Sequence, residues 1–159
     1  MSILGRFKYF LWMFGHFKVP LIGHVKPKLI QIDDQKAIVR IPLKRRNKNH
    51  LNSMYFGVLA VGADLAGGLH GFYHADKAKV KASLAFKSFH ADFLKRPYEA
   101  VYFVSEDGDM VADMIVQSQQ EQKRINQMVR VNAYTGFEQT AEKVATFQLE
   151  LSIKVENGR

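Results

Sequence analysis

One stretch decides how this chain folds: MYFGVLAVGADLAGGLHGFY, residues 54–73. Its side chains are almost all apolar or small, and Asp64 is its only acidic group. Twenty such residues could cross a bilayer, but an aspartate in mid-span costs about 2.5–3.5 kcal/mol, and five glycines weaken the case further. A helix that is apolar on every side must instead be surrounded by protein. The stretch therefore predicts a long, buried central helix that a sheet or a second helix can approach closely.

Strand patterns lie on both sides of this helix. Before it, β-branched runs at 28–32 and 36–42 are separated by 33–35, Asp-Asp-Gln, which predicts a hairpin. After it, apolar residues alternate over 80–93 and change parity near residues 87 and 88. A change of parity within one strand predicts a long strand that carries a β-bulge.

The remaining patterns complete the element order. A strand is predicted over 98–105 and a short helix over 107–118. Alternating residues over 125–133 and 145–153 predict two half-buried strands joined through Gly136. Strands that follow one another with a single long helix among them predict an α+β fold, with one antiparallel sheet wrapped around that helix.

The N-terminal residues carry a second helix pattern. Aromatic and aliphatic residues recur at spacings of three and four, which predicts an amphipathic helix over 3–18 that ends at Pro20. The stripe consists of Ile3, Phe7, Phe10, Phe14 and Phe17. The favoured interpretation is a helix packed on the main fold, and the alternative is a helix that lies on a membrane surface.

Composition limits the class of protein. The chain has 159 residues, 47% of them hydrophobic, so we expect one domain over 1–159 with residues 1–20 packed on it. It has no cysteine, which excludes thiol catalysis and disulfides. A net charge of +8 favours anionic ligands. Basic residues are spread through the N-terminal apolar residues, and no alanine precedes Ala37, so we expect no cleaved signal peptide and a cytoplasmic location.

Most known catalytic patterns are missing from the sequence. It contains no phosphate-binding glycine loop and no Gly-x-Ser-x-Gly elbow. His70 and His74 have a spacing that could hold a metal, but near a helix end such residues are more often surface or capping residues. We therefore assign no metal site.

A polar loop at 44–53 leads into the central helix and is expected to supply its N-cap. The run NHLNSMYFG at 49–57, followed by ADLAGG at 63–68, resembles the hotdog-fold acyl-CoA thioesterase superfamily of the phenylacetyl-CoA and 4-hydroxybenzoyl-CoA thioesterase type. It is similar to a bacterial branch of that superfamily with an Asn-His loop and an added N-terminal helix. The family pattern is an Asn-rich loop that runs into His-Gly-Gly, with Ala-Asp-x-Ala-Gly-Gly further along the helix.

The resemblance implies a role for each matching residue. Asn49 matches the loop asparagine, Gly57 the glycine whose amide polarises the thioester carbonyl, and Asp64 the acid that serves as base or nucleophile. Tyr55 stands in place of the histidine and Phe56 in place of the first glycine, so both are expected to contact the substrate. No separate cofactor is implied, because coenzyme A is part of the substrate.

Basic residues in two loops are candidates for the phosphates of coenzyme A: Arg45 and Arg46 in one, Lys95 and Arg96 in the other. The alternative is that these are ordinary solvated loop charges. Nucleic acid is not expected as a partner, because no nucleic-acid-binding motif accompanies them.

Gly57 and Asp64 are seven residues apart, or about 10.5 Å along a helix axis. A single chain could not bring both to one carbonyl, so the resemblance predicts a homodimer with a shared site, and a tetramer stays open. Two other functions stay open as well. One is a non-catalytic acyl or acyl-CoA binding protein of the same fold, and the other is a basic module that binds a membrane surface or nucleic acid.

Overall fold

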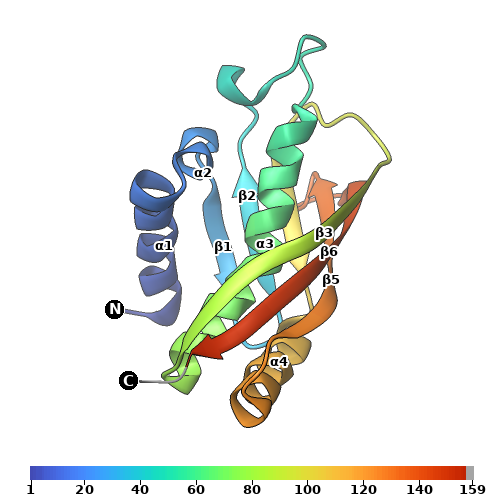
Figure 1. Ribbon diagram of the computed structural model, residues 1–159. Coiled ribbons are helices and arrows are strands. Elements are labelled where there is room, and N and C mark those ends of the chain that lie inside the picture. Colours follow the sequence, from blue (N-terminus) through green and yellow to red (C-terminus); the bar gives the residue numbers. More distant parts are fainter. Residues whose placement is uncertain (157–159) are drawn as a thin grey trace.

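One antiparallel sheet wraps around a long central helix (Figure 1). The computed structural model describes residues 1–156. Six strands lie in the order β1-β2-β4-β5-β6-β3. Their bounds are β1 Lys28–Ile32, β2 Ala37–Ile41, β3 Lys81–Phe93, β4 Val101–Ser105, β5 Ile125–Thr135 and β6 Glu142–Glu156. The helical segments are α1 Ile3–Met13, a π-helical turn η1 Phe14–Lys18, α2 Pro20–Val25, a 3-10 turn η2 Arg45–Asn47, α3 Phe56–Ala78 and α4 Gly108–Glu121. The predicted α+β class is confirmed.

The central helix α3 is buried along most of its length, as its all-round apolar sequence predicts. Its small residues allow the sheet to come close. A Cβ on Gly62 would overlap the ring of Phe103, which lies fully buried in β4. Glycine at this position is therefore a packing requirement.

The strand predictions hold, with differences of one to three residues in the bounds. β1 and β2 form the expected hairpin, and β3 pairs with β6 with a register shift between Phe86 and Ser88, where the bulge is predicted. β4 begins at Val101, three residues later than expected. The preceding segment passes the start of α3, where the carbonyl of Pro97 accepts a hydrogen bond from the amide of Met54 at 2.9 Å.

The N-terminal helix packs on the fold by one face. Phe7 is buried against Tyr73 of α3, with ring centroids 5.6 Å apart, whereas Phe17 at the end of the predicted stripe is 69% exposed. Pro20 does more than end the helix, which is a correction to the prediction. It occupies the first turn of a second helix, α2, where a proline lacks no needed donor.

The two edges of the sheet differ. Helix α1 packs against β1 at one edge (Figure 1). At the other edge, β3 pairs only with β6 among the described residues, and most of its side chains are exposed or half-buried. No helix within residues 1–156 is long and apolar enough to cross a bilayer.

Candidate active site

Asp64 lies on the wall of an apolar cavity. The cavity has a volume of about 300 Å³ and lies between α3, β3 and the N-terminal helices. Its apolar walls come mainly from Phe10, Phe14, Ile22, Phe72, Leu84 and Phe86. No side chain or amide of the described chain donates a hydrogen bond to Asp64, and no cation pairs with it. Burial raises the pKa of this carboxyl above its ordinary value.

The start of α3 differs from the sequence prediction. The polar loop at 44–53 is expected to supply the N-cap, but Tyr55 occupies the N-cap position and its side chain makes no capping bond. Residues 50–53 form a turn and a bend, with Asn52 at a φ of +62°, and Met54 then forms an isolated bridge with Lys48. The prediction was wrong because Asn49 and Ser53 bond to each other and not to the amides of the helix.

The first amides of α3 are consequently free to bind a ligand. Phe56 and Gly57 occupy the first turn, where helical geometry supplies no carbonyl partner, and no other acceptor among the described residues bonds to them. The ring of Tyr55 lies against Gly57, because a Cβ there would come within 2.5 Å of Tyr55 Cε1. The ring of Tyr55 therefore takes the space that a side chain at position 57 would need.

Tyr55 and Phe56 form an exposed aromatic pair at this end of the helix, with ring centroids 4.8 Å apart. Phe56 also meets Phe93 of β3 edge to face at 6.2 Å. The three side chains are 46%, 60% and 51% exposed. They mark an apolar patch where the helix start meets the edge strand.

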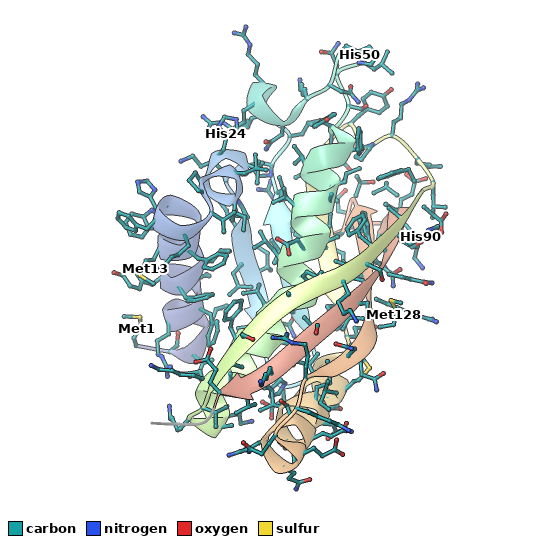
Figure 2. The ribbon with its side chains drawn as sticks, viewed as in Figure 1. Met1, Met13, His24, His50, His90 and Met128 are labelled. Atoms are coloured by element: carbon teal, nitrogen blue, oxygen red, sulfur yellow. The ribbon has the colours of Figure 1, made fainter. Side chains whose placement is uncertain are left out.

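Asn49 serves its own loop. Its amide nitrogen donates to Ser53 Oγ at 2.9 Å, and its oxygen accepts from the amides of Leu51 at 2.9 Å and Ser53 at 3.2 Å. Figure 2 shows His50 at the outer tip of this loop, away from the body of α3. The side chain of Asn49 thus fixes the loop that precedes Gly57.

Asn47 is a second loop anchor, which the sequence analysis did not single out. It is fully buried, and its amide nitrogen donates to the carbonyls of Val25 at 3.0 Å and Pro42 at 2.8 Å. The backbone carbonyl of Asn47 accepts a hydrogen bond from the backbone amide of Tyr55 at 2.9 Å. The sequence gives no signal for this role, since Asn47 stands among exposed basic residues.

The structure does not bring the predicted catalytic residues together within one chain. Asp64 borders the cavity, whereas Asn49, Tyr55, Phe56 and Gly57 lie outside it, at the start of α3.

Arg45 and Arg46 lie in a broad basic groove of about 1120 Å³. The groove is also lined by His24, Lys26, Lys28, Arg40 and Lys44. Arg46 is held by a hydrogen bond from Nη1 to the carbonyl of His24 at 3.2 Å. The cations contributed by α2, β1 and β2 were not predicted from the sequence. An uneven distribution of charge along the chain could have shown them.

Lys95 and Arg96, the other pair of residues predicted to contact phosphate, lie in a different environment from Arg45 and Arg46. Lys95 forms an ion pair with Glu142, and Arg96 is exposed next to it. Neither residue lines the basic groove.

His70 and His74 are buried, which corrects the expectation of surface or capping residues. Their Nε2 atoms lie 3.1 Å from the carbonyls of Asp33 and Asp34, so both rings tie α3 to the turn of the β1–β2 hairpin. Burial lowers the pKa of each ring, and the nearby His74 lowers that of His70 further. No group of three or more possible metal ligands occurs within the described residues.

Known structures share this architecture at low sequence identity. A candidate thioesterase from Shewanella oneidensis superposes with a TM-score of 0.80 at 15% identity, covering 94% of this chain and 99% of the other. A protein of unknown function from Chlorobaculum tepidum gives 0.82 at 13% identity, covering 97% of each chain. A thioesterase from Haemophilus influenzae gives 0.69 at 12% identity, covering all of this chain and 96% of the other.

These superpositions confirm the thioesterase-like hotdog fold. No curated protein matches the sequence. A family model described as Domain of unknown function (DUF4442) matches residues 7–153, which is nearly the whole chain, and this chain therefore belongs to the DUF4442 family.

Proposed function

We propose that this protein is a thioesterase that hydrolyses an acyl-CoA to the free acid and coenzyme A. One observation carries the proposal: Asp64 presents a carboxylate without a protein partner to an apolar cavity of about 300 Å³. An unpaired carboxylate beside apolar walls is costly for the fold and useful for proton transfer. The thioesterase-like fold supports the same conclusion.

Asp64 can act in either of two ways. As a general base it removes a proton from water while the water oxygen bonds to the thioester carbonyl carbon. The C–S bond then breaks, the electron pair leaves with sulfur, and the proton passes to the thiolate. As a nucleophile the carboxylate attacks the carbonyl itself and expels the thiolate, and water then hydrolyses the resulting anhydride. The raised pKa of Asp64 favours its action as a base.

The oxyanion donor in this proposal is the amide of Gly57, at the positive end of the α3 dipole. About 10.5 Å of helix separates it from Asp64 of the same chain. Two copies of α3 that run antiparallel across a two-fold axis would place Asp64 beside Gly57 of the partner subunit. The proposed active site is thus shared, and Asn49 is a positioning residue that holds the loop before Gly57.

The β3 edge is the surface that suits this homodimer. Leu84, Ala85 and Phe86 of β3 line the Asp64 cavity, so a copy paired along β3 would lie next to the carboxylate. Phe89 and Phe93, further along the same strand, are 46% and 51% exposed. A long edge strand with exposed aromatic residues is poorly suited to water and well suited to a partner.

The basic groove is the proposed site for the nucleotide end of coenzyme A, with Arg45 and Arg46 as the main phosphate contacts. Arginine forms paired hydrogen bonds with phosphate oxygens, and no carboxylate lines this groove to compete.

Thiol release from a panel of acyl-CoA esters, aliphatic and aromatic, tests the proposal. Wild type should turn over at least one class of ester, and Asp64→Asn should lower turnover by about 10²–10⁴-fold because an amide is neither base nor nucleophile. Binding of the same ester to the variant should persist. Turnover by Asp64→Asn within a few-fold of wild type would reject Asp64 as the catalytic group.

A second function, non-catalytic binding of acyl-CoA, is favoured by two observations. The side chain of Asn49 is engaged in its own loop, and the ring of Tyr55 packs against Gly57. If wild type binds acyl-CoA esters but releases no thiol from any of them, the protein is a binding protein.

A further inference from the structure

The positive charge of the protein is concentrated in its first 63 residues. They contain eleven Lys or Arg side chains and two carboxylates, whereas residues 64–159 contain one more acidic than basic side chain. The two carboxylates, Asp33 and Asp34, lie in the β1–β2 turn, and Asp34 pairs there with Lys77 at 2.5 Å. The N-terminal helices therefore have no carboxylate of their own to offset their cations.

The outer face of these helices carries a row of exposed aromatic rings. Tyr9, Trp12 and Phe17 are 58%, 55% and 69% exposed, although α1 also supplies buried Phe7 and Leu11 to the core. The ring of Trp12 stacks on Tyr9 and on His16, with ring centroids 5.9 Å and 5.0 Å apart. The rings of Phe17 and Trp12 meet edge to face, with centroids 6.2 Å apart. The row is an ordered apolar face, distinct from the one that packs on α3.

Three lysines lie beside Trp12, at the centre of this row. A surface hollow of about 330 Å³ is lined by Trp12 together with Lys8, Lys26 and Lys28, and no carboxylate lines it. None of these three lysines forms an ion pair with any described residue. Trp12, which stacks with the other exposed rings, thus stands directly beside unpaired positive charge.

We propose that this docking face, made of Tyr9, Trp12 and Phe17 with Lys8, Lys26 and Lys28, binds the surface of an anionic lipid bilayer. Tryptophan and tyrosine prefer the headgroup region, and lysines next to an anionic surface strengthen binding. The docking is peripheral, and it does not depend on whether the chain hydrolyses thioesters.

The stacking of Trp12 favours a bilayer over single-stranded nucleic acid. Nucleobases bind by stacking on free aromatic faces. Tyr9 and His16 stack on Trp12 with interplanar angles of 27° and 19°, so neighbouring rings already occupy its stacking positions. Tyr9, Trp12 and Phe17 nevertheless remain more than half exposed, and these rings can insert between lipid headgroups.

The protein contains its own probe, because Trp12 is its only tryptophan. Vesicles of equal parts phosphatidylcholine and phosphatidylglycerol should shift the emission of Trp12 to shorter wavelength and carry the protein in flotation. Vesicles of phosphatidylcholine alone should do neither, and added salt should reverse the binding.

Two double variants separate charge from apolar anchoring. Lys26→Gln with Lys28→Gln should weaken binding by about thirtyfold. Lys143→Gln with Lys154→Gln on β6 removes the same charge and should leave binding within a few-fold of wild type. Tyr9→Ala with Phe17→Ala should reduce binding by about tenfold or more. Met128→Ala is the matched apolar control, since Met128 is 44% exposed on the side of the molecule opposite α1 (Figure 2).

Several outcomes would overturn the proposal. One is an unchanged Trp12 spectrum with no flotation on anionic vesicles, and another is equal loss of binding in the control variants. A further such outcome is a protein that binds oligonucleotides but not vesicles, and that still binds oligonucleotides after Tyr9→Ala with Phe17→Ala. The basic charge would then serve nucleic-acid binding. A change of oligomeric state in that same variant would assign the face to a second copy of the chain.

Discussion

At the scale of single residues, Asp64 is the clearest conflict between folding and function. The carboxylate lies against apolar walls with no donor from the described chain, and burial raises its pKa. A group that is harder to ionise in the folded state than in the unfolded state destabilises the fold once the pH exceeds its unfolded pKa. Natural active sites often carry a cost of this kind.

Asp64→Asn should therefore raise the melting temperature at pH 7 by a few degrees while it abolishes turnover. Between the ordinary pKa of 3.8 and the raised folded value, the folded protein binds more protons than the unfolded chain, so wild-type stability falls as the pH rises through that window. The advantage of the variant should accordingly be largest at neutral pH and vanish near pH 4. Thermal melts of both proteins over this range provide the measurement.

Asp113→Asn, an aspartate substitution on the separate helix α4, is the control for loss of a negative charge and should show no such trend. A variant at position 64 that is less stable than wild type at pH 7 would mean that the carboxylate has a stabilising partner.

At the scale of elements, the contact between α3 and the sheet depends on residues without side chains. A Cβ at Gly62 would overlap the buried ring of Phe103, whereas a Cβ at Gly68 would make an ordinary contact with Phe86 at 3.6 Å. Gly62→Ala should cost about 1–3 kcal/mol by overpacking. Gly68→Ala should be neutral or stabilising by up to about 1 kcal/mol, because alanine favours the helix.

Urea unfolding of the two variants measures this difference. Equal stability of Gly62→Ala and Gly68→Ala would show that α3 can move away from β4 at little cost.

The short turn η2 offers a second prediction at this scale. Charge reversal at Arg45 with Arg46 should raise KM for CoA esters by about tenfold or more, because charged hydrogen bonds to phosphate are lost. KM for a truncated thioester without the nucleotide should stay unchanged. Steady-state kinetics on both substrates provide the measurement.

Charge reversal at Lys95 with Arg96 is the matched control, since Lys95 is engaged with Glu142 outside the groove. If charge reversal at Arg45 with Arg46 changes KM equally for both substrates, these arginines are ordinary solvated charges.

At the scale of the whole molecule, the proposed shared site allows a complementation test. Asn49→Ala and Asp64→Asn should each impair turnover, one by loosening the loop before Gly57 and the other by removing the base. When equal amounts of the two variants are unfolded and refolded together, random pairing makes about half of the dimers mixed. Each mixed dimer has one intact site. Roughly a quarter of wild-type activity should return.

Sedimentation and exchange of tagged subunits must accompany this assay. A mixture that exchanges subunits but regains no activity would refute the shared site, and so would a monomer at assay concentration.

The sequence by itself determined the six strands, the helices α1, α3 and α4 and their order, although not the short helix α2. The all-round apolar stretch of residues 54–73 required a surrounded helix, strict alternation marked the long strands, and the change of parity near residue 87 located the β3 bulge. These signals can be read locally because backbone geometry repeats at 3.6 residues per turn in a helix and at two in a strand.

Tertiary structure alone decided where chemistry can occur. Ser53 looks like a helix cap in the sequence, yet Asn49 engages it, and His70 and His74 look like surface residues until the β1–β2 turn covers them. The cavity at Asp64 needs walls from α1, α2, α3 and β3, and the basic groove needs α2, β1, β2 and η2. Such features depend on contacts between residues far apart in the chain. The energies of those contacts are set by burial and by available partners, which local periodicity does not encode.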